Sequence, residues 1–152
     1  QRFQWVGPIH KDRYVLVGRS GRGIRVTNPA DIARYRVGVI RADIGHKLLL
    51  EGGVPDAKLE KLANFRQLVK MLEADRVDLL CIGSSMIATF PRWGGFKPGD
   101  LSEVMTISDV AVYYAMSKGT DPALVKRFQS ALEAIEPETR RIMKTYQDIG
   151  LE

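Results

Sequence analysis

The stretch that decides the fold is residues 36–50, which read RVGVIRADIGHKLLL. Its first half is a short run of β-branched residues, and its second half has the apolar spacing of an amphipathic helix. A strand that enters a helix through a tight turn leaves the first backbone N–H groups of the helix without partners, and these donors can bind an anionic group. The turn at residues 41–45 is therefore the first candidate binding site.

A second unit of the same kind follows further along the chain. Residues 65–72 carry a helical apolar stripe behind the capping residue Asn64, and an apolar run over 77–82 ends in small polar residues. With a short strand expected at 59–62, the order is strand, helix, strand, helix, strand. This order predicts an α/β fold with a mostly parallel sheet, in which both units open into one crevice at the carboxyl edge.

The flanking segments contain further expected elements. Glu136-Pro137 is expected to separate the last two helices. These elements are strands at 3–9, 14–18, 104–107 and 110–117, a short helix after Asn28-Pro29, a helix beginning in 84–89, an irregular surface loop at 90–99, and helices at 122–135 and 139–149. The first of the two last helices is predicted to bury one face. That face consists of Leu124, Val125, Phe128, Ala131, Leu132 and Ile135.

The composition is that of a globular chain. Its 152 residues, 45% hydrophobic and 27% charged, suffice for one moderate core or for two half-cores joined by a hinge. The net charge of +5 permits contact with nucleic acid or anionic lipid. However, no aromatic residues are interleaved with the arginine cluster as a stacking platform for bases requires, so we interpret the cluster as solvated surface and expect no nucleic-acid partner. The cluster is Arg13, Arg19, Arg22 and Arg25.

Cysteine and histidine usage narrows the chemistry further. The single cysteine, Cys81, excludes an internal disulfide and a thiolate-rich zinc site, and its apolar surroundings predict a buried residue rather than a nucleophile. His10 and His46 have no carboxylates at metal-site spacing, so no metal or other cofactor is expected. No apolar run approaches the roughly 20 residues of a membrane span. The first residues are no signal peptide, but an exported domain whose leader has been removed would have the same sequence.

Several motifs, in this order, carry a resemblance to a known family. They are FQWVGP at 3–8, YVLV at 14–17, VGV at 37–39, RVD at 76–78 and YYAMSKGTD at 113–121. Together they resemble the extracytoplasmic solute-binding proteins of polar-amino-acid ABC transporters, the family 3 type. The resemblance implies a type II periplasmic-binding-protein fold, in which hinge closure traps a ligand between two α/β lobes.

The resemblance also implies a division of the chain. Residues 1–23 would be the end of the first lobe and a crossing strand, residues 24–101 a complete second lobe, and residues 102–152 the return strand and C-terminal helices of the first lobe. The family's opening first-lobe segment, whose serine and arginine hold a carboxylate, would precede Gln1. We expect the remnant of the first lobe to expose apolar surface, with the missing half disordered, removed, or replaced by a second copy in a swapped or symmetric dimer.

In the family, the loop after the valine-glycine-valine strand holds the ligand's carboxylate with backbone N–H groups and a polar side chain. Arg41, Ala42, Asp43, Ile44 and Gly45 occupy that loop here. Ala42-Asp43 replaces the usual glycine-threonine pair, so Asp43 is either a helix cap or a ligand contact. Arg41 either pairs with a ligand carboxylate or is solvated.

The family commonly places an acidic residue after the second strand to hold an α-ammonium group, and this chain has Gly83-Ser84-Ser85 there. Ser84 is either a hydrogen-bonding contact of the ligand or a helix cap. Without the carboxylate, either the ligand is no ordinary amino acid, or Asp43 or Asp109 holds its amine.

The leading interpretation is a non-enzymatic, periplasmic or otherwise extracytoplasmic component that presents a small polar ligand to an ABC permease in the membrane. The first alternative keeps the fold but makes the domain the extracellular sensor of a histidine kinase or cyclase, which a membrane span after Glu152 would favour. The second is an enzyme on the same fold, a dehydratase or a lytic enzyme. Its candidate acid–base pair is Asp43 and His46.

Overall fold

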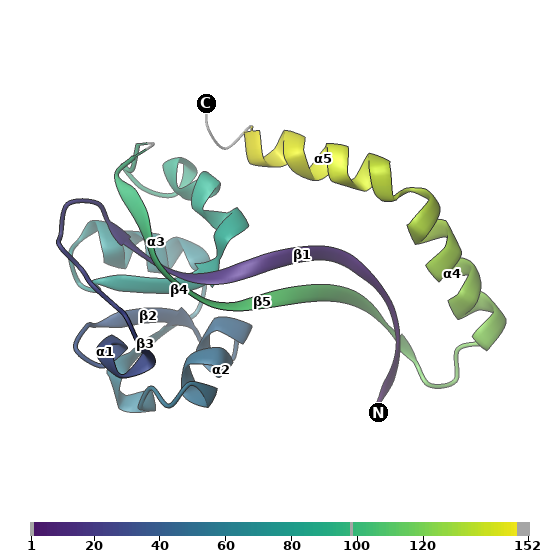
Figure 1. Ribbon diagram of the computed structural model, residues 1–152, viewed down its shortest axis with the longest axis horizontal. Helices are drawn as coiled ribbons and strands as arrows, with labels where there is room; N and C mark the ends of the chain where they lie inside the picture. The colour runs from purple at the N-terminus through teal and green to yellow at the C-terminus, as the bar shows by residue number, and fades with distance from the viewer. Residues whose placement is uncertain (1, 98, 149–152) are drawn as a thin grey trace.

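The computed structural model describes residues 2–97 and 99–148, without the side chains of 146–148 (Figure 1). In chain order the elements are β1 (Phe3–Arg19), α1 (Pro29–Ile32), β2 (Val37–Ile40), α2 (Ile44–Glu51), the 3₁₀ helix η1 (Asp56–Lys58), β3 (Leu59–Leu62), α3 (Phe65–Glu73), β4 (Leu79–Gly83), the 3₁₀ helix η2 (Ser84–Arg92), β5 (Leu101–Ser117), α4 (Pro122–Ala134) and α5 (Glu136–Asp148).

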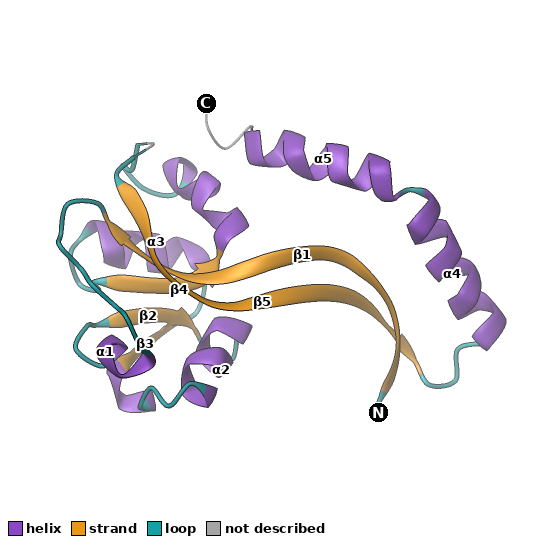
Figure 2. Cartoon of the chain, in the orientation of Figure 1, coloured by secondary structure: helices purple, strands orange, loops and turns teal. Residues whose placement is uncertain are grey.

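The strands form one sheet in the order β3-β2-β4-β1-β5 (Figure 2). β2 pairs in parallel with both β3 and β4, whereas β1 pairs antiparallel with β4 and β5. β5 therefore runs in the same direction as β2, β3 and β4, and only β1 is reversed. The predicted α/β fold with a mostly parallel sheet is confirmed.

The core lies on both faces of the sheet because side chains alternate along its central strand. In β4, Leu79 and Cys81 join the cluster under α1 and α2, and Leu80 and Ile82 join the cluster under α3 and η2. A strand covered on both faces needs the continuous apolar run that this segment has. Cys81 is 2% exposed, as expected for a small buried residue, and burial raises the pKa of its thiol to about 12.

The predicted helix starts are confirmed for α1 and α3. The Asn28 side chain accepts hydrogen bonds from the backbone N–H groups of Ala30 and Asp31, and the Asp31 carboxylate accepts in return from the backbone N–H of Asn28. The Asn64 side chain accepts from the N–H of Gln67. Each asparagine thereby satisfies donors that the first turn of the helix leaves open.

The long strands differ from the expectation. The predicted strands at 3–9 and 14–18 are parts of one strand, β1, and the two predicted at 104–107 and 110–117 are parts of β5. Both strands continue because they pair with each other over most of their length, with irregularities between Val6 and His10, between Tyr14 and Val15 and between Leu16 and Val17. This long-range pairing is invisible in local periodicity. The paired strands extend from the α/β body towards α4 (Figure 1).

The prediction of a buried face on the helix at 122–135 is wrong. α4 contacts β1 and α5 contacts η2, but Phe128 is 49% and Ile135 53% exposed, and α4 has no buried residue. The amphipathic pattern is present, but the described chain covers only part of the apolar side, where Val125 and Leu132 are half-buried. The exposed apolar surface expected for the remnant of the first lobe is present. α5 begins at Glu136, and the predicted last residue of that helix, Ile149, lies outside the described residues.

The segment after β4 also differs from the expectation. The helix expected to begin in 84–89 is the 3₁₀ helix η2, which continues to Arg92. The loop predicted at 90–99 does not lie wholly at the surface, because Phe90 and Phe96 are buried. Their rings pack edge to face with centroids 5.7 Å apart, and Phe65 packs on Phe90 in the same way. The aromatic residues of this segment therefore close one end of the core.

Candidate functional site

β2 and β4 are parallel neighbours in the sheet, as predicted. Val37 is paired with Leu79 and Gly38 with Leu80. A Cβ on Gly38 would lie 2.8 Å from Leu80 Cδ2 and 2.9 Å from Leu68 Cδ2, so a larger residue here would displace these buried leucine side chains. The loops that follow the two strands consequently start from neighbouring points on one edge of the sheet.

The loop after β2 contains five of the predicted site residues. Arg41, Ala42 and Ile44 are exposed, Asp43 is half-buried and Gly45 is buried. Ala42 adopts the left-handed conformation, with φ of 59°, which turns the chain from the strand into α2. The backbone N–H of Arg41 donates to the carbonyl of Leu62 at the end of β3, over 2.9 Å. Arg41 therefore sits on the β3 side of this edge.

Asp43 occupies the N-cap position of α2, but its carboxylate makes no capping hydrogen bond. Instead, Asp43 Oδ2 accepts a hydrogen bond of 3.2 Å from the Tyr14 hydroxyl on β1. Burial raises the pKa of Tyr14, and the negative charge of Asp43 and this hydrogen bond add to the effect. The capping role considered for Asp43 is thus not realised, because its carboxylate accepts no hydrogen bond from the first turn of α2.

Gly45 brings α2 close to β4. A Cβ at this position would lie 2.8 Å from the carbonyl oxygen of Cys81 and 3.2 Å from Tyr14 Cε1. The absence of a side chain therefore lets the first turn of α2 rest directly on the strand. The start of this helix therefore lies against Cys81 of β4.

Ser84 is held by a residue that the sequence analysis did not identify, Asp12 on β1. The Ser84 hydroxyl donates to Asp12 Oδ1 over 2.8 Å, and the Ser85 hydroxyl donates to Asp12 Oδ2 over 2.7 Å. The backbone N–H groups of Arg13 and Ser85 also donate to Oδ1. Ser84 is thus not a helix cap through its own side chain, and a carboxylate stands beside Gly83-Ser84-Ser85 after all.

The ionised form of Asp12 is stabilised in this position. Partial burial opposes ionisation, but the hydrogen bonds from Ser85, Ser84 and the two backbone N–H groups outweigh it and lower the pKa of Asp12 below its ordinary value of 3.8. The signal that would reveal Asp12 is non-local, because the pairing of β1 with β4, with Tyr14 opposite Gly83, brings it to this edge.

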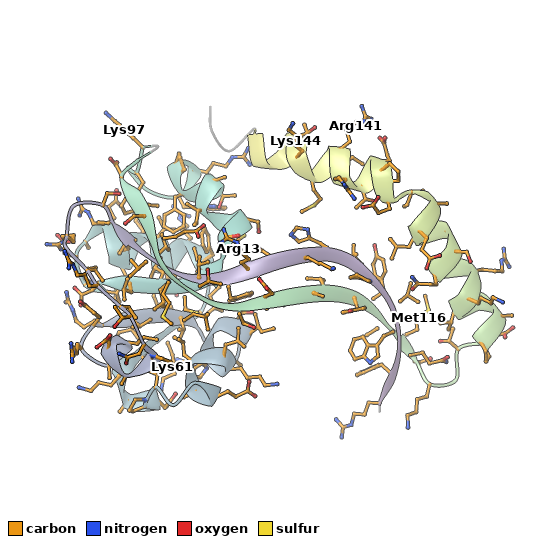
Figure 3. The ribbon with its side chains drawn as sticks, viewed as in Figure 1. Arg13, Lys61, Lys97, Met116, Arg141 and Lys144 are labelled. Carbon is orange, nitrogen blue, oxygen red and sulfur yellow. The ribbon has the colours of Figure 1, made fainter. Side chains whose placement is uncertain are left out.

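A hollow of about 460 Å³ adjoins this carboxylate. It is lined by His10, Lys11, Asp12, Arg13, Ser84, Asp109, Val110 and Ala111. Figure 3 labels Arg13 on β1, where the paired long strands leave the α/β body. The structure therefore brings Ser84 and Asp109 together in the lining of the hollow. The loop 41–45 does not line the hollow. It is joined to β1 by the hydrogen bond from Tyr14 to Asp43.

The described residues contain no group of three or more histidine, cysteine, aspartate or glutamate side chains placed to hold a metal ion. Within the same residues, no helix combines the length and the apolar character needed to cross a membrane. Of the arginine cluster, Arg19 and Arg22 form ion pairs with Asp75, and Arg13 pairs with Glu103.

Fold and site geometry together give an α/β body with polar residues at the carboxyl ends of its parallel strands. Comparison with solved structures confirms the fold expected from the resemblance. An amino acid ABC transporter substrate-binding protein, AbpA from Streptococcus pneumoniae Canada MDR_19A bound to L-arginine, superposes with a TM-score of 0.81 and 15% identity, over 99% of this chain and 63% of that protein.

Two further structures illustrate the range of this fold. Holo ArgBP from T. maritima has a TM-score of 0.69 and 20% identity over 95% of this chain and 62% of its own. A histidine kinase sensor domain with similarity to periplasmic binding proteins has a TM-score of 0.73 and 18% identity over 99% and 63%. The chain thus spans less than two thirds of the length of these structures. No family model and no curated protein matches the sequence.

Proposed function

We propose that this chain is part of an extracytoplasmic solute-binding protein that takes up a small zwitterionic ligand, such as an amino acid, at the edge formed by β2 and β4. The observation that carries the proposal is the arrangement of donors and acceptors at this edge. The start of α2 offers backbone donors. Asp12 with the hydroxyl groups of Ser84 and Ser85, which we call the Asp12 corner, offers acceptors. A ligand with one anionic and one cationic end is complementary to both.

The acceptor character of the Asp12 corner follows from the direction of its hydrogen bonds. A serine hydroxyl has one proton, and those of Ser84 and Ser85 both point to Asp12. The two hydroxyl oxygens therefore offer only lone pairs to a third group, next to an ionised carboxylate. Such a corner favours an ammonium or guanidinium group over a carboxylate. In our proposal Asp12, together with Asp109, replaces the acidic residue that the family carries after this strand.

The anionic end of the ligand would lie at the start of α2. The uncapped first turn supplies backbone N–H groups from Ile44 and Gly45, and the positive end of the helix dipole favours a negative group there. Arg41 and Ala42 complete the loop in this proposal, and Arg41 is free to approach a carboxylate from solvent. Asp43 would then turn away from the anion because Tyr14 holds it.

The division of the chain into parts of two lobes is also a proposal. Residues 24–101 contain α1 to η2 and most of the two core clusters, and β1 completes these clusters with Leu16 and Val17. Residues 1–23 and 102–152 contribute the long strand pair and the helices α4 and α5, whose apolar side chains remain exposed. A second lobe, built from further chain or from a second copy, would cover them and close over the ligand.

The protein partner of such a domain would be an ABC permease, which the likeness to transporter substrate-binding proteins favours. The likeness to a histidine kinase sensor domain supports the second candidate, the extracellular part of a signalling receptor. The two candidates share the same site chemistry. They are distinguished by the protein that captures the ligand-bound form, a permease or a membrane-bound kinase.

The experiment is a calorimetric titration of the full gene product, and of the 152-residue chain, with matched solutes. One set consists of α-amino acids with cationic, anionic and neutral side chains, including L-arginine and L-glutamate. The other sets lack either the ammonium group or the carboxylate. We expect saturable binding of zwitterions alone and its loss in Asp12→Asn, because the cationic end then loses its charged partner. Equal binding of the amine-free acids, or no saturable binding of any solute, would contradict the proposal.

A further inference from the structure

His46, in the first turn of α2, contacts both the loop after β2 and the 3₁₀ helix η1. Its Nδ1 accepts a hydrogen bond of 3.3 Å from the backbone N–H of Ala42, and its Nε2 lies 2.9 Å from Asp56 Oδ1 on η1. The side chain is only 14% exposed. Asp56 in turn accepts a hydrogen bond from Lys61 on β3, which Figure 3 labels in the part of the molecule that β3 and α2 occupy.

These two contacts indicate which tautomer the neutral ring adopts. Because Nδ1 accepts a hydrogen bond, it carries no proton, so the proton of a neutral ring is on Nε2 and points to Asp56. The Ala42 N–H belongs to a residue in the left-handed conformation, which an alanine side chain disfavours. The imidazole is therefore a partner that helps to hold the loop in its turn.

Protonation of the ring would affect the two contacts differently. A proton on Nδ1 turns this atom into a donor that faces the donor of Ala42, so that hydrogen bond is lost. The contact with Asp56 is kept and gains charge. Hydrogen bonds from Lys61 and His46 lower the pKa of Asp56, so its carboxylate stays ionised in mild acid. The ring would remain tied to η1 while the loop is released.

We propose that His46 is a positioning residue that holds Ala42 and the adjoining loop in place only while its ring is neutral, so that mild acidification loosens this part of the site. The charged groups that face the ring are Asp56 on η1 and, through Asp56, Lys61 on β3. Arg41 and Asp43 belong to the loop that the ring holds. That this loop binds solute rests on the proposed function, but the contact itself does not.

The test is a nitrogen-15 NMR titration of the described chain without any solute, from about pH 8 to about pH 5, the range in which histidine changes charge. At the upper end we expect ring signals of the Nε2–H tautomer. As the ring is protonated, the amide signal of Ala42 should move with the same midpoint, and its hydrogen exchange, corrected for pH, should accelerate about tenfold, as loss of one hydrogen bond predicts.

Two variants separate positioning from a merely structural effect. His46→Asn places an amide oxygen near the position of Nδ1 without a titrating group, so the Ala42 amide should stay protected and stop responding to pH. Lys47→Ala, on the next and exposed position of α2, should leave the wild-type response intact. An Nδ1–H tautomer, or an Ala42 amide that ignores the ring's titration, would overturn the proposal. An equal pH response in His46→Asn would do the same.

None of these measurements involves a ligand. A negative result would therefore leave the proposed solute site standing, and failure of solute binding would leave the role of His46 standing. If His46→Asn does not fold, the wild-type titration alone still decides between a held and an unheld Ala42.

Discussion

Single residues determine the chemistry of the edge formed by β2 and β4. Asp12 is ionised and receives donors from Ser84, Ser85 and the backbone, so it orients both hydroxyls. Gly45 leaves the space through which α2 reaches β4. One carboxylate and one absent side chain thus set which groups lie at this edge.

The first prediction concerns the pH dependence that Asp12 contributes. Its pKa is lower in the folded chain than its ordinary value of 3.8, so its ionised form stabilises the fold above about that pH. This contribution is lost as the pH falls through the lowered pKa. We expect the free energy of unfolding to fall more steeply with acidification in the wild type than in Asp12→Asn. Urea denaturation at a series of pH values measures it, with Asp109→Asn as the matched control, and parallel curves for wild type and Asp12→Asn would contradict it.

The second prediction concerns Gly45. Gly45→Ala places a Cβ within 2.8 Å of the Cys81 carbonyl oxygen, which belongs to the backbone of a buried strand and has little room to move. We expect a loss of about 1–3 kcal/mol in the free energy of unfolding, the usual cost of overpacking. Gly119→Ala is the control, because a Cβ there meets nothing within 4 Å. Equal effects of the two substitutions would show that α2 does not rest on β4 in this way.

The sequence predicted the site unevenly at this scale. The position of residues 41–45 and Ser84 at the ends of two strands could be predicted, because strand periodicity and turn residues are local signals. Asp12 was missed because only the antiparallel pairing of β1 with β4 brings it to Ser84. The hydrogen bond between Tyr14 and Asp43 was missed for the same reason, and with it the uncapped start of α2.

Among the elements, the register between β2 and β4 determines where the two polar loops start. Gly38 is paired with Leu80, and a Cβ on Gly38 would contact the Leu80 side chain at 2.8 Å. The pairing places the carboxyl ends of both strands at one edge. A shift of one residue would turn the side chains of the moved strand to the opposite faces.

The third prediction is a double-mutant cycle on this pair. Gly38→Ala should cost about 1–3 kcal/mol by overpacking, and Leu80→Ala about 2–5 kcal/mol by leaving a cavity. The double variant should cost about 0.5–3 kcal/mol less than the sum, because the new methyl group uses part of the vacated space. Chemical denaturation measures all three variants.

The matched control pairs Gly38→Ala with Leu50→Ala, which removes an exposed side chain of α2. That combination should be additive. Additivity of Gly38→Ala with Leu80→Ala as well would mean that the two residues do not face each other.

Elements were predictable where local signals determine them. β2, α2, β3, α3 and β4 follow from periodicity and from caps such as Asn64, whose side chain bonds to the N–H of Gln67. The lengths of β1 and β5 were not predictable, because their continuity comes from pairing between distant parts of the chain. The exposure of α4 was mispredicted since an amphipathic pattern does not say whether the partner surface is present.

In the molecule as a whole, apolar side chains remain exposed on the long strand pair, on α4 and at Ile135, directly after α4. They include Trp5, Tyr113, Tyr114, Leu124, Phe128 and Ile135. Soluble monomers rarely leave large contiguous apolar patches uncovered. We therefore expect another surface to cover these side chains, either the rest of a first lobe or a second copy of the chain.

The fourth prediction follows for the isolated 152-residue chain. It should self-associate reversibly, and the double substitution Phe128→Ser with Ile135→Ser should shift the equilibrium to the monomer by removing two half-exposed apolar side chains. Sedimentation velocity over a range of concentrations measures the effect. Arg127→Ser changes an exposed residue of the same helix and is the control. A wild-type chain that stays monomeric throughout would contradict the prediction.

In our proposal, the edge formed by β2 and β4, with Asp12 beside it, binds a small solute. Amide NMR of the 152-residue chain during titration with zwitterionic amino acids tests it most directly, because it detects even the weak binding of a single lobe. We predict that the largest shifts occur at Ile44, Gly45, Ser84 and Ser85 and that Asp12→Asn abolishes them. Shifts confined to other surfaces, or no shifts with any of these solutes, would contradict the account.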